Sequence, residues 1–243
     1  MSKEVNNLLE FDFEPELPSW AKTLAVFDLE TTGLDVRTAR IVTATVATLN
    51  QAGEVTTLRE WLVNPGIEIP EAASSVHGVT TEMAIANGEE PLEAILEMVD
   101  LLGNLNQEMP LVAFNAPYDF SILSFEAQRH GLSPLDPKPV IDPLVLDRKF
   151  DRYRKGKRNL GLMSAHYGVK LEDAHNSTAD AVAAGLIAQA IARKFEEAKV
   201  SAEQLHSSQK VWSDEQSESF AEYLRKQNRP DYRAELGWPI KIS

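Results

Sequence analysis

Residues 24–33 of the chain read LAVFDLETTG, a short apolar run that leads into two acidic residues separated by one position. Because side chains at positions i and i+2 of a strand lie on the same face, we expect Asp28 and Glu30 to direct their carboxylates to one place. Two like charges side by side are unfavourable unless a cation joins them. The segment therefore indicates a metal site, although a bare pair of acids with this spacing is more often a solvated strand end before a turn.

The segments around this one predict the rest of a sheet. Residues 41–49 (IVTATVATL) are rich in β-branched side chains, and residues 55–63 alternate before the breaker NPG. The tripeptide QAG at 51–53 fits a tight hairpin, so these two strands are expected to be antiparallel. Strands then alternate with helices, which predicts an α/β domain with a mixed sheet covered by helices. The later strands are expected at residues 111–114 and 140–141, and the helices at residues 91–102, 117–130, 143–150, 160–167 and 178–194.

Two further acids stand where predicted helices begin. Asp119 lies just beyond the strand at 111–114, and Asp180 lies in the first turn of the last helix, which Ser177 or Thr178 could cap. A carboxylate in a first turn complements the helix dipole, so each acid taken alone is explained equally well by a structural role. His175 precedes the last helix in a loop, where a lone histidine is usually a surface residue.

Taken together, the three segments resemble the DEDDh (DnaQ-like) family of 3′-to-5′ exonucleases, which includes the proofreading subunit of bacterial DNA polymerase III. FDLETTG is similar to the first motif of that family, NAPYDF to the second and HNSTAD to the third, with the five-residue separation of the histidine branch. The phrases VNPGIEIP, SSVHGVTTEM and VIDPLVLDRKF agree in order. The resemblance covers residues 22–195 and implies a ribonuclease-H-like fold, a five-stranded mixed sheet flanked by helices with the acids beside its centre.

The resemblance also implies a mechanism. Two Mg²⁺ or Mn²⁺ ions, which prefer oxygen ligands, would bind the four acids, with Asp28 as the bridging ligand. Glu30 would orient the attacking water and His175 would act as general base, since an imidazole can accept a proton near neutral pH. The expected catalytic and metal-binding residues are Asp28, Glu30, Asp119, Asp180 and, as the base, His175.

Substrate contacts are expected directly after the first motif. Gly33 would let the backbone of the nucleic acid approach closely, and Leu34 could wedge against a base. The expected substrate-binding residues are Thr31, Thr32, Gly33, Leu34, His77 and Asn115, although His77 is more often structural or a nucleotide neighbour than catalytic. Asp142, before Pro143, is expected to cap a helix rather than to bind metal.

Charged residues are distributed unevenly along the chain. A formal net charge of −13 argues against a nucleic-acid partner, because phosphate binding rests on positive potential. Between residues 148 and 158, however, seven of eleven positions are Lys or Arg, and Tyr153 lies among them. This run is a candidate phosphate track, with a solvated loop as the alternative.

Length and composition are those of a soluble protein with one sizeable domain. We assign residues 1–21 to an acidic arm that Trp20 could pin to the domain, residues 22–199 to an exonuclease domain, and residues 200–243 to a helical appendage that packs on it or docks a partner. The appendage contains an amphipathic helix that residues 228–230 would end. The absence of cysteine excludes disulfides and thiolate ligands, and without a secretory signal or an apolar run of membrane length we expect a cytoplasmic protein.

The sequence thus predicts a metal-dependent exonuclease of the proofreading or repair type, which hydrolyses terminal phosphodiesters at the 3′ end of DNA and releases nucleoside 5′-monophosphates. The expected partners are the 3′ end of single-stranded DNA or RNA and a polymerase or another replication protein. An exoribonuclease that trims RNA stays open, because the same metals serve both sugars. A non-catalytic nucleic-acid-binding module is the alternative from another class. The complete set of four acids and one histidine argues against it, since a degenerate relative would be expected to lack at least one.

Overall fold

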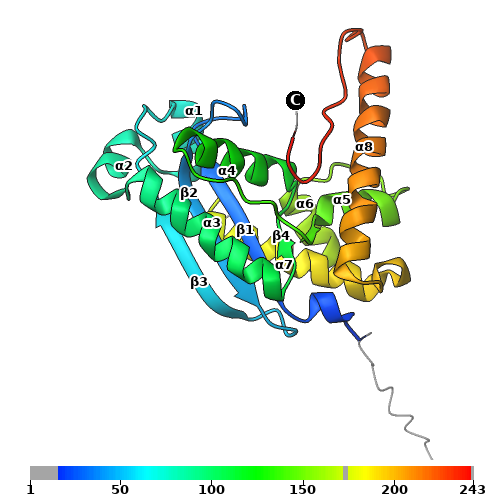
Figure 1. Ribbon diagram of the computed structural model, residues 1–243. Helices are drawn as coiled ribbons and strands as arrows, with labels where there is room; N and C mark the ends of the chain where they lie inside the picture. Colours follow the sequence, from blue (N-terminus) through cyan, green and yellow to red (C-terminus); the bar gives the residue numbers. More distant parts are fainter. Residues whose placement is uncertain (1–15, 172–174, 242–243) are drawn as a thin grey trace, which may run out of the picture.

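A mixed sheet forms the centre of the computed structural model, which describes residues 16–171 and 175–241 (Figure 1). The strand order is β3-β2-β1-β4-β5, with β2 antiparallel to β1 and β3, and β4 parallel to β1 and β5. The strands are β1 (Leu24–Thr31), β2 (Ile41–Leu49), β3 (Val55–Leu62), β4 (Leu111–Val112) and β5 (Val140–Ile141). The predicted five-stranded mixed sheet is confirmed.

A tight turn joins β2 to β3, as the sequence predicts. The Asn50 side-chain oxygen accepts hydrogen bonds from the backbone N–H groups of Ala52 (2.9 Å) and Glu54 (3.0 Å). Gly53 supplies the positive φ of 79° that closes the loop at little steric cost. The two strands are therefore held as an antiparallel hairpin.

Helices cover both faces of the sheet. Figure 1 shows α3 and α4 in front of the strands, with α7 behind them. The helices are α1 (Glu71–His77), α2 (Thr81–Asn87), α3 (Pro91–Glu108), α4 (Pro117–Arg129), α5 (Pro143–Phe150), α6 (Leu160–Tyr167), α7 (Ser177–Lys194) and α8 (Ala202–Lys226), with short 3₁₀ turns at η1 (Ser19–Ala21) and η2 (Glu196–Ala198). In the described residues, no helix combines the length and the apolar character needed to cross a membrane.

The alternation of β1 divides the core into two layers. Ala25, Phe27 and Leu29 pack into the cluster that contains the buried side chains of α3 and α4. Leu24 and Val26 pack into the cluster on the opposite face, against α5 and α7. Because successive side chains of a strand alternate, Asp28 and Glu30 continue the face of Leu24 and Val26. Both acids therefore lie on the α7 side of the sheet.

Helix α7 packs very closely on the central strands. A β-carbon at Gly185 would lie 2.5 Å from the Leu49 side chain and 2.6 Å from that of Val26, closer than real β-carbons come to other atoms. Glycine at this position removes that clash and lets the helix backbone approach β1 and β2. The first turn of α7 is thereby brought towards the acids of β1.

Several predicted boundaries were wrong. Helix α3 continues six residues beyond the predicted end at 102, β4 ends at Val112 rather than at 114, and the short helices α1 and α2 were not predicted. Helix α7 begins one residue earlier than predicted, and its cap is Asn176, whose side chain accepts hydrogen bonds from the N–H groups of Thr178 (3.0 Å) and Ala179 (3.2 Å). Ser177 is the first helical residue, not the cap.

The C-terminal helix α8 covers the β5 edge of the sheet. His206 Nδ1 accepts a hydrogen bond from the Val140 N–H (3.0 Å). The Gln209 amide accepts from the Asp142 N–H (2.8 Å) and donates to the Val140 carbonyl (3.0 Å), as a neighbouring strand would. Side chains of α8 thus satisfy backbone groups that an open edge would leave exposed.

Both ends of the described chain contact the domain. The Trp20 indole donates to the Ala198 carbonyl (2.9 Å), which places the anchor expected for the N-terminal arm, while residues 1–15 of that arm lie outside the described residues. Helix α8 ends at Lys226, just before the predicted stop. The tail then returns beside α4 (Figure 1), where the buried Trp238 indole donates to Asp142 (3.4 Å) and the Lys241 N–H donates to the Ser121 hydroxyl (2.8 Å).

Candidate active site

Asp119 is held between the two acids of β1. Helix α4 begins at Pro117, so Asp119 lies in its first turn, where it is buried. Its Oδ1 atom accepts a hydrogen bond from the backbone N–H of Leu29 (3.1 Å), the residue between Asp28 and Glu30. A contact across 90 positions of sequence therefore joins the second motif to the first.

The third motif is joined to the same strand through β2. Thr45 pairs with Asp28 in the sheet, and its hydroxyl forms hydrogen bonds with the hydroxyls of Ser177 (2.9 Å) and Thr178 (2.9 Å) at the start of α7. Asp180 follows in the same first turn. Three hydroxyl groups thus fix where the α7 carboxylate meets the acids of β1.

His175 completes the cluster just before α7. One possible ligand atom each from Glu30, His175 and Asp180 lies within 4.8 Å of the others. The backbone N–H of His175 donates to Asp180 Oδ2 (3.2 Å), and His175 has a φ of 72°, which non-glycine residues rarely adopt. Asp180 Oδ1 is buried and has no hydrogen-bond partner. An unpaired buried carboxylate oxygen is costly, so the site is incomplete without a further donor or a cation.

The carboxylates destabilise one another's charged forms. Burial raises the pKa of Asp28 well above its usual value, and the charges of Asp119, Asp180 and Glu30 raise it further. Burial and the charge of Asp180 raise the pKa of Glu30 to about 7. Burial likewise raises the pKa values of Asp119 and Asp180. A divalent cation would relieve the repulsion among these four neighbouring carboxylates, so the cluster is an environment that favours cation binding.

A small apolar cavity adjoins Glu30. Its volume is 270 Å³, and it lies between the end of β1 and helix α1. Tyr118 forms one side: its hydroxyl lies 2.6 Å from the Thr31 hydroxyl and donates to the Gly33 carbonyl (2.9 Å). The lining residues are Glu30, Thr31, Thr32, Gly33, Leu34, Pro70, Ala72, Ala73, Val76, His77 and Tyr118. The cavity therefore lies directly beside one of the four acids.

Five of the six predicted substrate-binding residues line this cavity. Leu34 is 88% exposed, so its side chain is free to contact a ligand. His77 ends α1, and burial lowers its pKa, which favours the neutral imidazole. Asn115 does not line the cavity. Tyr118 was not singled out in the sequence analysis, because nothing in the sequence shows that its hydroxyl reaches Thr31 and Gly33, more than 80 positions earlier.

Asp142 is the helix cap that the sequence predicts, and it does more. Its carboxylate accepts hydrogen bonds from the N–H groups of Leu144 (2.9 Å), Asn115 (3.1 Å) and Ala116 (3.0 Å). Asn115 has a φ of 62°, which these bonds help to hold. The buried Asp142 therefore positions the turn that leads into α4 and Asp119.

A family comparison agrees with this arrangement. The family model described as Exonuclease matches residues 25–187, which contain all three acidic motifs and His175. The chain belongs to the exonuclease family. The match confirms the resemblance drawn from the three motifs.

The curated relatives of this exonuclease are much longer proteins, and the chain matches only a small part of each. It is 32% identical over 165 residues to the PolC-type DNA polymerase III of Streptococcus suis, and 30% identical over 164 residues to that of Streptococcus sanguinis. The aligned region covers 67% of this chain in both cases and 11% of each relative. The exonuclease thus resembles one segment of these polymerases.

Solved structures show the same fold. A structure of exonuclease I has a TM-score of 0.63 at 16% identity, covering 82% of this chain and 46% of that one. E. coli exonuclease I in complex with a dT13 oligonucleotide has a TM-score of 0.58 at 17% identity, covering 69% and 40%. These similarities confirm the expected ribonuclease-H-like fold of the exonuclease.

Proposed function

We propose that this exonuclease removes nucleotides from the 3′ end of a DNA strand in a reaction that depends on divalent cations. The observation that carries the proposal is the meeting of acids from β1, α4 and α7. Asp119 accepts from the N–H between Asp28 and Glu30, and Asp180 raises the pKa of both of those acids. No single element of the fold could supply this cluster.

The donor set fits hard divalent cations. Asp28, Glu30, Asp119 and Asp180 offer only carboxylate oxygens, which Mg²⁺ and Mn²⁺ prefer. The buried, unpartnered Asp180 Oδ1 also needs a positive neighbour. When bound, two such ions supply Lewis-acid stabilisation of the charge that develops on the phosphate. We infer that these four acids hold them.

The remaining steps fall to side chains around the acids. His175, beside Glu30 and Asp180, accepts the proton of the attacking water. Glu30 orients that water. The terminal nucleotide enters the cavity between β1 and α1, where Tyr118 holds the backbone of Gly33 in place. Attack on the last phosphodiester then releases a nucleoside 5′-monophosphate.

DNA is proposed as the substrate on the strength of the similar proteins. The curated relatives are DNA polymerases, and the E. coli exonuclease I structure contains a dT13 strand. The relatives also make a polymerase or another replication protein a reasonable partner. RNA is the alternative substrate that an experiment must separate.

A time course on end-labelled strands tests the proposal. Matched DNA and RNA oligonucleotides carrying a 5′ label are incubated with Mg²⁺, with Mn²⁺ or with a chelator. We expect a ladder that shortens from the 3′ end of the DNA, nucleoside 5′-monophosphates as products, and no reaction with the chelator or with Asp28→Ala. Internal cleavage, full activity with the chelator, or full activity of Asp28→Ala would contradict the proposal. Faster hydrolysis of RNA would reassign the substrate.

A further inference from the structure

Within the basic run at residues 148–158, the five basic side chains from Arg152 to Arg158 separate into two groups in the structure. Arg154 and Arg158 turn inward and are mostly buried. Arg152, Lys155 and Lys157 are exposed and, among residues 16–171 and 175–241, take part in no ion pair. The run is therefore neither a uniform phosphate track nor a simple solvated loop.

The inward group fixes the loop to the domain. Asp147, fully buried on α5, accepts hydrogen bonds from Arg154 (2.7 Å), Arg158 (2.6 Å) and the Tyr167 hydroxyl (2.7 Å). Burial alone would raise the pKa of Asp147, but these three donors hold it below its usual value. Arg158 also donates to the carbonyls of Asp151 (2.9 Å) and Arg154 (3.1 Å), which closes the loop on itself.

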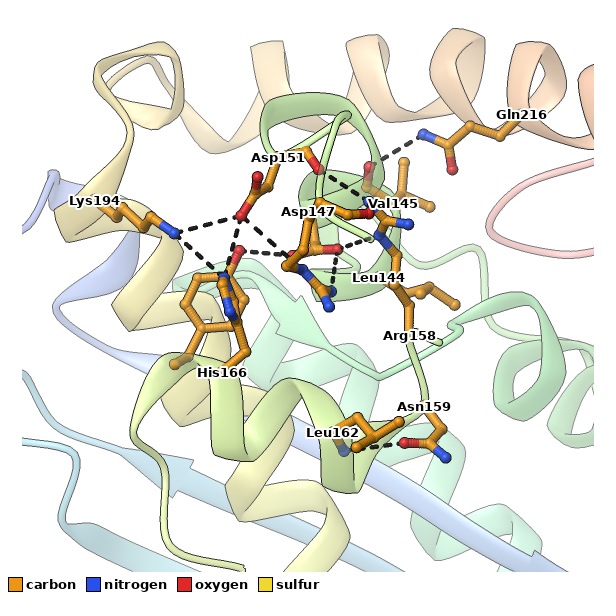
Figure 2. A network of polar contacts seen from close by, with 12 residues as sticks. Leu144, Val145, Asp147, Asp151, Arg158, Asn159, Leu162, His166, Lys194 and Gln216 are labelled. Atoms are coloured by element: carbon orange, nitrogen blue, oxygen red, sulfur yellow. Dashed lines mark hydrogen bonds and ion pairs between the residues drawn. The ribbon is translucent and has the colours of Figure 1, made fainter. Parts of the chain in front are cut away.

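A second contact holds the start of the loop. Figure 2 shows Asp151 directed towards His166 and Lys194, which lie 3.1 Å and 3.4 Å from its Oδ2 atom. The two aspartates and His166 have the spacing of a metal site, but three basic side chains already neutralise them. We therefore assign this cluster a structural role, which is to keep residues 151–158 in one conformation.

The outward group combines three cations with one aromatic ring. Tyr153 is 87% exposed, so its ring is free to contact a partner. The Arg152 guanidinium lies over this ring, 5.6 Å from its centroid. Cations beside an exposed ring are the combination that binds single strands, since the cations attract phosphates and the ring stacks on a base. We call Arg152, Tyr153, Lys155 and Lys157 the outer loop face.

This face is connected to the active site through α5. Arg148, one turn before the loop, lines a cavity of 100 Å³ together with Asn115, Pro117 and Asp142. Asn115 and Pro117 begin the segment that carries Asp119. Arg148 thus lies near the segment that carries Asp119, and the outer loop face follows Arg148 along the chain.

We propose that the outer loop face binds a single strand of DNA upstream of the 3′ end that enters the active site. The inference rests on the proposed function, because it assumes that a strand leaves the site. The inward arginines preorganise the loop, so little conformational entropy is lost on binding. The outer cations contact phosphates and Tyr153 stacks on a base.

Binding measured with a chelator present tests the proposal without any hydrolysis. The triple variant Arg152→Ala/Lys155→Ala/Lys157→Ala is compared with wild type by fluorescence anisotropy on labelled strands of about 20 and about three nucleotides. We expect the Kd for the long strand to rise about tenfold or more, with a smaller change for the short one, and the salt slope to fall by about 2. Tyr153→Ala should weaken binding of the long strand about tenfold while leaving the salt slope unchanged.

A control variant separates local contacts from overall charge. The control Lys210→Ala/Lys226→Ala/Arg229→Ala also removes three positive charges, but from exposed positions on and after α8. We expect this variant to bind the long strand as wild type does. If the outer-face variant binds normally, or if the control loses as much affinity, the proposal is overturned. Hydrolysis by wild type is assayed separately. A protein that binds a strand through the loop but degrades nothing would refute the proposed function, and with it the placement of the strand upstream of a 3′ end in the active site, while strand binding by the outer loop face would remain.

Discussion

His175 occupies a strained backbone position beside Glu30 and Asp180. A positive φ at a non-glycine residue persists only where its surroundings hold it, and such residues gather at functional sites. The N–H of His175 donates to Asp180, so one residue both fixes a carboxylate and presents an imidazole to the cluster. This geometry favours the role of general base for His175 over that of an ordinary surface histidine.

Replacing His175 by Ala should therefore slow hydrolysis by about 10² to 10⁴ while sparing the fold, because a general base contributes about that factor. The rate is measured under single-turnover conditions, and the binding of Mn²⁺ is measured alongside. His130→Ala, at the end of α4 and outside the site, serves as the control and should retain the wild-type rate. Loss of Mn²⁺ binding in His175→Ala would show that the histidine is a ligand rather than the base.

Glu30 links the stability of the metal-free protein to pH. Its pKa is raised from 4.5 to about 7, first by burial and then by Asp180. An acid whose pKa is higher in the folded state contributes stability that is full below the unfolded pKa and is lost as pH rises through the folded pKa. In a chelator, the contribution of Glu30 should therefore disappear between about pH 4.5 and pH 7.

Thermal unfolding of wild type and Glu30→Gln with a chelator checks this sign. Relative to wild type, the variant should gain stability as pH rises from 5 to 8, since it has no proton to lose at that position. Adding Mn²⁺ at pH 8 should stabilise wild type. A difference between the two proteins that stays constant over this range would contradict the raised pKa of Glu30.

At the scale of elements, α8 replaces a sixth strand at the β5 edge. The Gln209 side chain satisfies both the Asp142 N–H and the Val140 carbonyl. Gln209→Leu would leave these two backbone groups without partners. We expect a loss of about 1–3 kcal/mol in the free energy of unfolding, measured with urea. Gln227→Leu, at the exposed end of α8, should change it little, and equal stability of the two variants would argue against this role for Gln209.

Most elements could be predicted because their apolar residues recur at the spacing of a strand or a helix. The apolar strand at 24–27 and the helix that ends at Lys194 have clear patterns, and the sheet follows from them. Helix α1 could not be predicted, since it has seven residues and none of them is buried, so no apolar stripe marks it. The cap of α7 was misassigned because Asn176, Ser177 and Thr178 are all good capping residues. The structure selects Asn176, since Thr45 engages the other two hydroxyls.

The site could be predicted only in part from first principles. Alternation along a strand places Asp28 and Glu30 on one face without further information. The approach of Asp119 and Asp180 depends on contacts with Leu29 and Thr45 that no local pattern shows, so their grouping came from the family resemblance. The link between Asp142 and the buried Trp238 of the C-terminal tail is equally invisible in sequence.

At the scale of the whole molecule, the two layers of helices meet at the acids. Asp28 and Glu30 face the α7 layer, while Asp119 comes from α4, which packs on the other face of the sheet. The hydrogen bond from Leu29 to Asp119 crosses between these layers at the end of β1. The complete fold is therefore needed to bring these acids together from segments that are far apart in sequence.

Calorimetric titration with Mn²⁺ of wild type and of Asp28→Asn measures this cluster directly, before any substrate is added. We expect wild type to bind Mn²⁺ with release of protons, because acids with raised pKa values must lose them. Asp28→Asn should bind Mn²⁺ far more weakly while remaining folded. Equal binding by both proteins, or no binding by wild type, would contradict this expectation.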